Sequence, residues 1–363
     1  MSALDFTQTD RTRRIDEDER ARILADPGFG QYYTDFMAHA SWREDSGWDG
    51  GEVVPFGPLS LSPAAAVLHY GQEIFEGLKA FRHADGSVWT FRPDRNAERL
   101  QRSARRLALP ELPTEAFLAS LRAVAAADEP WVPEATSEES LYLRPFMFAS
   151  EEFLGVRAAH AVEYYVIASP AGPYFPRGVQ PLVVWISDEY ARAGAGGTGA
   201  AKCGGNYASS LLGKREAAAQ GADEIMFLDS ETHTSIDELS GMNVFAVTAD
   251  GRLLTPTLTG SILEGVTRES ILRLAADRGL EPIEQKLDVS EVLAQLGSGE
   301  ITEMFACGTA AVINPIGEFR AHGGSWTVGD SGSGEVTLAL RQELTDIQYG
   351  RVPDRHGWLT RLV

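Results

Sequence analysis

The segment from Arg192 to Leu212, with the sequence RAGAGGTGAAKCGGNYASSLL, constrains the fold of this chain more than any other. It holds six glycines within thirteen residues, and they surround a lysine, Lys202. Glycine carries a large backbone-entropy cost in helices and strands, so we expect an irregular loop here. Lysine occurs at four positions in the chain, while arginine supplies the other 28 of the 32 basic residues. A reactive amine in the most glycine-rich loop predicts that Lys202 takes part in chemistry.

Length and composition limit the class of protein. A chain of 363 residues is long enough for two domains, each with its own core. The formal net charge of −20 argues against nucleic acid as a partner. Two cysteines, Cys203 and Cys307, provide neither a disulfide framework nor a four-ligand metal site, so we expect no metal. The acidic N-terminus lacks the apolar segment of a targeting peptide, and no apolar run is long enough for a membrane span. These features predict a soluble, cytoplasmic protein.

Hydrophobic periodicity and turn signals predict strands and helices in a mixed order. Asp85-Gly86 predicts a hairpin, and amphipathic spacing predicts helices over residues 94–107 and 114–127. A further helix is expected from about Tyr207 to Ala219, directly after the glycine-rich segment. Three prolines and two glycines within residues 169–178 indicate a domain boundary. We therefore predict a smaller N-terminal α/β domain (1–170), an interdomain loop (171–181) and a larger C-terminal domain (182–363).

Two nucleotide-binding interpretations of the glycines can be weighed and rejected. Gly194, Gly196 and Gly199 satisfy G-x-G-x-x-G, but that motif requires a helix to open at its third glycine. The paired glycines Gly204-Gly205 are expected to prevent a helix here. A phosphate-binding P-loop fails because Ala200 stands where its lysine is needed. A flexible loop with an exposed lysine remains as the purely structural alternative.

A pyridoxal phosphate site would explain the lysine and its companions. Such a site needs a Schiff-base lysine, an acid for the pyridine nitrogen, a phosphate cradle and a donor for the ring hydroxyl. Glu238 follows Lys202 by 36 residues and supplies an acid. A glycine turn at residues 263–268 opens a helix whose N–H groups suit a phosphate, and residues 308–310 form a second such turn. Each feature alone is more often plain structure, but the set in this order predicts a cofactor site.

Six runs of residues closely resemble one known family across about residues 29–350. They are GGTGAAKCGGNYASS, FEGLKAF, FRPDRNAERLQRSARRL, LYLRPF, LEGVTR and FACGTAAV. They are similar to the branched-chain amino acid aminotransferases, of the fold-type IV pyridoxal phosphate class. The resemblance implies a two-domain, mixed α/β (α+β) fold like that of D-amino acid aminotransferase, and a homodimer. It also implies reversible transfer of the amino group of leucine, isoleucine and valine to 2-oxoglutarate.

The resemblance assigns roles around the cofactor, pyridoxal 5'-phosphate. Lys202 is the catalytic residue, which forms the imine and moves a proton. Glu238 would pair with the pyridine nitrogen and Tyr207 with the ring hydroxyl. Among four arginines on one helix face, which are otherwise expected to be solvated, Arg99 would grip the phosphate. The other implied cofactor positions are Val266, Thr267 and Thr309 at the phosphate, Leu263 against the ring, and Arg192 nearby.

The same resemblance implies a substrate pocket that two subunits complete. An aromatic pocket without fixed charge suits branched aliphatic side chains. Arg144 would receive the distal carboxylate of glutamate in the second half-reaction. The pocket positions implied within one chain are Phe29, Phe75, Tyr142 and Ala310, and those contributed to the neighbouring subunit are Tyr70, Leu154 and Val156.

Some positions depart from the family pattern, and some alternatives stay open. Ser240-Gly241 replaces a Gly-Thr pair found beside the cofactor acid in some members, with an effect on the pocket that the sequence does not define. Ala311 and Asn314 stand where mammalian members have a pair of redox-active cysteines, so that switch is expected to be absent. D-amino acid aminotransferases and aminodeoxychorismate lyases share the fold-type and remain alternatives. A non-catalytic cofactor-binding or interaction protein is a further alternative.

Overall fold

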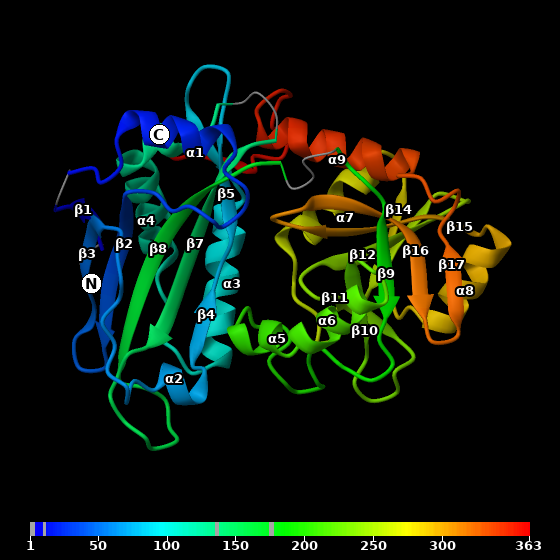
Figure 1. Ribbon diagram of the computed structural model, residues 1–363, viewed down its shortest axis with the longest axis horizontal. Helices are drawn as coiled ribbons and strands as arrows, with labels where there is room; N and C mark the ends of the chain where they lie inside the picture. The colour runs from blue at the N-terminus through cyan, green and yellow to red at the C-terminus, as the bar shows by residue number, and fades with distance from the viewer. Residues whose placement is uncertain (1–3, 10–11, 135–137, 174–177) are drawn as a thin grey trace. The chain divides into compact units, whose positions relative to one another are not determined.

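The computed structural model describes residues 4–9, 12–134, 138–173 and 178–363 (Figure 1). The chain divides into two compact units. Unit 1 comprises Met1–Pro176, Ala201–Gly204 and Asp346–Val363, and unit 2 comprises Arg177–Ala200 and Gly205–Thr345. The division falls within the expected interdomain loop, of which residues 174–177 lie outside the described residues. Two segments expected in the C-terminal domain, 201–204 and 346–363, instead belong to unit 1.

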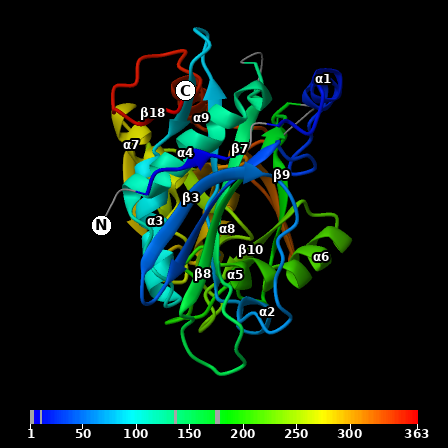
Figure 2. The ribbon, with the colours of Figure 1, turned by 90° about the vertical axis from the view of Figure 1, so that its left-hand side faces the viewer.

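Unit 1 is built on one large, mainly antiparallel sheet. Within the described residues it has nine strands in the order β1-β3-β2-β8-β7-β5-β6-β18, with β4 paired to β7. Helices α3 and α4 lie on one side of this sheet (Figure 2). The strands are β1 (Thr7–Gln8), β2 (Phe36–Arg43), β3 (Gly47–Pro55), β4 (Glu73–Phe75), β5 (Leu78–Arg82), β6 (Val88–Phe91), β7 (Ser140–Ala149), β8 (Ala161–Ala171) and β18 (Leu359–Arg361). The helices are α1 (Glu17–Ala25), α2 (Val67–Tyr70), α3 (Pro93–Arg106), α4 (Thr114–Ala127) and the 3-10 helix η1 (Glu129–Trp131).

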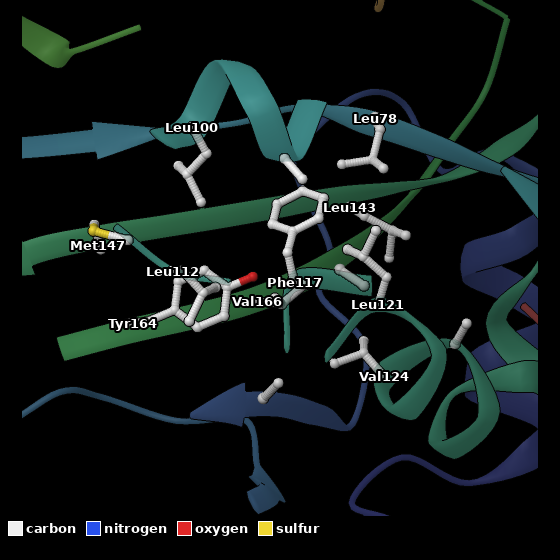
Figure 3. Close-up of a cluster of buried hydrophobic side chains, with 14 of the residues drawn as sticks. Leu78, Leu100, Leu112, Phe117, Leu121, Val124, Leu143, Met147, Tyr164 and Val166 are labelled. Carbon is white, nitrogen blue, oxygen red and sulfur yellow. The ribbon is translucent and has the colours of Figure 1, made fainter. Parts of the chain in front are cut away.

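The core of unit 1 forms where α3 and α4 meet the sheet (Figure 3). Leu100 from α3 and Phe117 and Leu121 from α4 are almost fully buried against strand residues such as Leu143. Full burial of one such side chain contributes about 1.5–3 kcal/mol. The Tyr164 hydroxyl, in the same core, forms a 2.9 Å hydrogen bond with the Ser120 hydroxyl. The amphipathic stripes predicted for residues 94–107 and 114–127 are therefore the core-facing sides of α3 and α4.

A pair of buried carboxyl groups ties the start of the chain to unit 1. Asp35 accepts hydrogen bonds from the backbone N–H groups of Arg14 and Ile15 at 3.0 and 3.2 Å. It also accepts one from the Trp131 indole at 2.9 Å. Asp128, at the end of α4, accepts the Phe36 N–H at 3.3 Å, while its Oδ1 atom is buried and has no hydrogen-bond partner among the described residues. These polar contacts hold the segment around Arg14 and Ile15, for which the sequence alone indicates only a high content of charged residues.

Unit 2 holds the second sheet. Its nine described strands run in the order β11-β10-β9-β16-β15-β12-β13-β14, with β17 paired to β16. The strands are β9 (Leu182–Ile186), β10 (Glu224–Leu228), β11 (Ile236–Leu239), β12 (Asn243–Thr248), β13 (Arg252–Pro256), β14 (Glu281–Gln285), β15 (Ile301–Gly308), β16 (Val312–Ala321) and β17 (Gly324–Thr327). The helices are α5 (Gly204–Ala208), α6 (Leu211–Ala219), α7 (Val266–Asp277), α8 (Val289–Ser298) and α9 (Glu335–Gln348), with the first residue of α5 and the last three of α9 counted in unit 1.

The structure confirms the mixed α/β class and corrects the helix predicted from Tyr207 to Ala219. That stretch contains two helices, α5 and α6, separated at Ser209 and Ser210. The Ser210 hydroxyl donates to the Tyr207 carbonyl at 2.7 Å, and such side-chain bonds compete with helix continuation. The paired glycines Gly204-Gly205 do not prevent a helix, because they begin α5. No helix in the described part of the chain is long and apolar enough to cross a membrane.

Candidate active site

Unit 1 holds Lys202 through its backbone. The Lys202 N–H donates to the Ser103 hydroxyl on α3 at 2.9 Å, and its carbonyl accepts the Phe75 N–H at 2.9 Å. The side-chain Nζ atom lies 4.7 Å from the centre of the Phe75 ring. The glycine-rich segment thus crosses briefly into unit 1 at residues 201–204, where the lysine is fixed between a helix and a strand.

Arg99 lies in an ion pair with a carboxylate that sequence reasoning missed. Glu76 is fully buried and accepts from Arg99 Nε and Nη2 at 2.7 and 2.8 Å. Asn96 adds a third bond at 2.7 Å. Burial would raise the pKa of Glu76, but Arg99 and then Lys202 outweigh it and lower the pKa, so the carboxylate is ionised. The sequence carried one signal for this ion pair. Glu76 lies within the mainly apolar run FEGLKAF, and a buried charge needs a partner.

Three aromatic side chains and one arginine contact one another in unit 1. The rings of Phe29 and Tyr142 meet edge to face at 5.1 Å. The Arg144 guanidinium lies 4.7 Å from the centre of the Phe75 ring and donates to the Tyr142 hydroxyl at 3.1 Å. Within the described chain, the Arg144 Nε atom is buried without an acceptor. At Gly77, a Cβ atom would overlap the Tyr142 hydroxyl, so glycine is required for the ring to lie there.

The three residues predicted to serve a neighbouring subunit lie on α2 and in the loop between β7 and β8. Tyr70 ends α2, and its hydroxyl donates to the carbonyl of Leu154. Tyr70, Leu154 and Val156 are 41%, 66% and 89% exposed. All three side chains therefore lie at the surface of unit 1.

Unit 2 holds the predicted acid, Glu238, on β11. Its Oε1 atom accepts from Arg192 Nη1 at 2.8 Å and from the Leu263 N–H at 2.9 Å. Both charged side chains are 2% exposed. Asn243, which sequence reasoning missed, donates to Glu238 Oε2 at 3.3 Å and to the Leu263 carbonyl at 3.0 Å. Glu238, Arg192 and Leu263, widely separated in sequence, are therefore brought together.

Tyr207 and the departure at Ser240-Gly241 also lie near this acid. The Arg192 guanidinium is 5.9 Å from the centre of the Tyr207 ring. The Ser240 hydroxyl donates to Glu224 at 2.7 Å and so is used in a separate contact. A Cβ atom at Gly241 would lie 3.8 Å from the Tyr207 ring, an ordinary contact distance. Glycine at this position leaves a small gap beside the ring rather than relieving a clash.

Two features of unit 2 can bind an anion, and Asn243 borders both. Helix α7 begins after Gly265 without a capping side chain, and the Val266 and Thr267 N–H groups donate to no acceptor within the described chain. A Cβ atom at Gly265 would overlap the Asn243 amide, so glycine is needed there. Asn243 also pairs across the sheet with Cys307, directly before the turn. That turn carries Thr309 and Ala310 between β15 and β16.

These groups define a class of enzyme, and comparisons with known proteins agree. The sequence profile described as amino-transferase class IV matches residues 73–319. The chain belongs to the class IV aminotransferase family. The branched-chain-amino-acid aminotransferase of Mycolicibacterium smegmatis is 54% identical over 362 residues, which cover 99% of this chain and 98% of that protein.

Solved structures give the same family at lower identity. A branched-chain amino acid aminotransferase from the organism abbreviated T.th., solved with pyridoxamine 5'-phosphate, is similar, with a TM-score of 0.74 and 31% identity over 90% of this chain and 99% of that one. The same enzyme complexed with N-(5'-phosphopyridoxyl)-L-glutamate gives a TM-score of 0.74 and 30% identity, with the same shares covered.

Proposed function

We propose that this chain is a pyridoxal 5'-phosphate-dependent branched-chain amino acid aminotransferase. It transfers the amino group of L-leucine, L-isoleucine and L-valine reversibly to 2-oxoglutarate. The observation that carries the proposal is the setting of Lys202, held by two backbone hydrogen bonds with its amine over the Phe75 ring. The relatives with this name, one of them 54% identical over nearly the whole chain, support the substrate class.

The residues present fit the cofactor. An uncapped helix start at α7 and the turn at Thr309 offer N–H groups and a hydroxyl to a phosphate. The close approach of Gly265 to Asn243 shapes the first of these. The similar solved structures contain pyridoxamine 5'-phosphate or a phosphopyridoxyl compound. When bound, the cofactor supplies an aldehyde and an electron-withdrawing ring, chemistry that no amino-acid side chain provides.

In this proposal each side chain has a separate task. Lys202 Nζ would hold the cofactor and would carry the proton that transamination moves. Glu238 would pair with the ring nitrogen, and Arg192 forms an ion pair with that buried carboxylate at 2.8 Å. Arg99 contributes positive charge for the phosphate while Glu76 fixes its guanidinium plane. Tyr207 serves the ring hydroxyl, and Leu263 contacts the ring face.

Substrate selection follows from the aromatic group of unit 1. Phe29, Phe75 and Tyr142 give an apolar surface for branched side chains, with Ala310 as a further pocket residue. The buried Nε atom of Arg144 has no acceptor within the described chain, which leaves its guanidinium able to bind the distal carboxylate of glutamate. One arginine held against two aromatic rings can thus serve the charged substrate without excluding the apolar ones.

The proposed assembly is a homodimer in which each subunit completes the other's pocket. The exposed side chains of Tyr70, Leu154 and Val156 support this part of the proposal. Mixing inactive Lys202→Ala chains with Tyr70→Ala chains tests it. Hybrid dimers would contain one pocket with both native residues and would recover activity, whereas independent subunits would stay inactive or impaired.

A steady-state assay tests the function. Purified holoenzyme should show an absorbance band near ~410–430 nm and transaminate L-leucine with 2-oxoglutarate. Lys202→Ala should retain cofactor through its phosphate contacts but lose measurable turnover. Activity with D-alanine and none with L-leucine would instead assign the chain to the D-amino acid enzymes. Appreciable turnover by the Lys202→Ala variant would refute the role of the lysine.

A further inference from the structure

The turn between β15 and β16 contains a residue in an unfavourable backbone conformation. The strands pair with Gly308 opposite Val312, which leaves three loop residues, 309–311. Val312 has a φ of 61°, in the left-handed region. A residue with a positive φ is usually glycine, because a Cβ atom is strained in this conformation, and a β-branched residue there is an outlier. A β-branched residue at this position requires contacts elsewhere to hold the turn.

Two buried side chains supply those contacts. Asn314 is fully buried, and one end of its amide faces two carbonyl oxygens. Only the amide nitrogen can bond there, so we assign the nitrogen to this end, where it donates to the Ala311 carbonyl at 3.0 Å and to the Ile313 carbonyl at 3.1 Å. Arg341, on α9, is 4% exposed and donates from Nη1 to the same two carbonyls at 3.5 and 3.4 Å. The carbonyl groups on both sides of Val312 are therefore bound by the same pair of donors, which we call the turn brace.

The turn brace limits what the three loop residues can do. Binding the Ala311 carbonyl fixes the peptide plane between Ala311 and Val312, and the strands fix both ends of the loop. Thr309 and Ala310 are left with little backbone freedom. Burying an arginine and an asparagine costs free energy, since polar groups lose their hydration on burial. This cost indicates that the fixed geometry of the turn is used.

We infer that Asn314 and Arg341 are positioning residues, which hold the strained turn so that Thr309 and Ala310 keep one orientation toward their ligands. The identity of those ligands, the cofactor phosphate and the substrate, rests on the proposed function. Neither brace residue needs to touch a ligand. Their effect passes through the carbonyl groups of Ala311 and Ile313.

Substitutions separate this role from ordinary core packing. Asn314→Ala removes one donor pair, and Val312→Gly removes the strain that the brace opposes. Ser120→Ala, in the core of unit 1, is the matched loss of a buried polar group in the other unit. Two readouts are used on the full chain: hydrogen–deuterium exchange of amides 309–313, and pyridoxal 5'-phosphate affinity by titration after the cofactor is removed.

Asn314→Ala is expected to speed exchange in the turn and to weaken cofactor binding by about tenfold, as expected for lost hydrogen bonds to a fixed loop. The double variant Val312→Gly/Asn314→Ala should recover most of the protection from exchange and most of the cofactor affinity, because glycine adopts the left-handed conformation without strain. Ser120→Ala should change neither readout. If Asn314→Ala does not fold, Arg341→Met carries the same expectations.

If the folded Asn314→Ala variant, or Arg341→Met in its place, exchanges the amides of the turn at the wild-type rate, the inference is overturned. It is also overturned by a double variant that binds cofactor no better than the single one, since a packing role predicts further loss when the Val312 side chain is removed. If the wild-type chain itself binds no pyridoxal 5'-phosphate, the proposed function fails, while the exchange measurement still decides whether the brace holds the turn.

Discussion

The buried carboxyl group of Asp128 predicts how the stability of unit 1 depends on pH. Burial raises the pKa of Asp128 to about 7, and the nearby charge of Asp35 adds to the rise, while hydrogen bonds from Thr34 and backbone N–H groups oppose it. In the part of the chain that the structure describes, the buried Oδ1 atom has no hydrogen-bond partner, which is consistent with a carboxyl group that binds a proton at neutral pH. Asp128→Asn replaces it with a neutral group of nearly the same shape.

The direction of this pH dependence follows from the pKa of Asp128 in the folded and in the unfolded chain. The folded chain has a pKa of about 7 at Asp128, against an ordinary value of 3.8 in the unfolded chain, so the folded chain binds the extra proton between these values. The contribution to stability is fully present below the unfolded value and is lost as pH rises through the folded value. At about 1.4 kcal/mol for each pKa unit, the loss between about pH 5 and pH 8 is about 3 kcal/mol.

Urea unfolding of the wild type and of Asp128→Asn at several pH values between about 5 and 8 measures this loss. The free energy of unfolding of the variant should rise relative to the wild type by about 3 kcal/mol across the range, because other titrating groups are common to both chains. Asp45→Asn, a substitution on an exposed turn, is the control and should follow the wild type. Parallel curves for wild type and Asp128→Asn would show that Asp128 is already ionised in the folded chain, and the reasoning would be refuted.

Three further substitutions test the candidate site. Glu76→Gln leaves the buried Arg99 without its counter-charge and should lower stability by about 3–5 kcal/mol, measured by denaturant unfolding; a loss below about 1 kcal/mol would mean the pair is solvated. Gly77→Ala places a methyl group where the Tyr142 hydroxyl lies, so kcat/KM for leucine should fall by about tenfold or more with little loss of cofactor, and an unchanged value would contradict the rigid pocket. Glu238→Gln removes the anionic partner of the ring nitrogen and should lower kcat by about a hundredfold while cofactor stays bound; wild-type kcat would exclude the proposed pairing.

Local patterns in the sequence predicted the regular parts of the fold well. The stripes of α3 and α4 lie at 3.6-residue spacing, and the structure begins and ends these helices within one residue of the prediction. The Asp85-Gly86 turn joins β5 to β6 as expected, with Gly86 at a φ of 85°. The prediction of one continuous helix after the glycine-rich segment was wrong. The Ser209 and Ser210 hydroxyls bind carbonyl groups, and this ends α5.

The candidate site was predictable only where the residue type itself carries chemistry. Lys202 and Glu238 stood out as a lysine and an acid in unusual surroundings. Glu76 and Asn243 did not, because their importance comes from partners far away in the chain: Arg99 lies 23 residues from Glu76, and Leu263 lies 20 from Asn243. No local pattern encodes such pairing.

The short return of the chain into unit 1 at residues 201–204 has a consequence for folding. Lys202 is fixed by Phe75 and by Ser103, which is 99 residues earlier. Contacts of such long sequence separation form late, because a large loop must close before they contribute. The amine therefore reaches its final place only after β4 and α3 have assembled. A truncated C-terminal half would contain Lys202 but not the contacts that hold it, so this half of the chain alone would not place the amine.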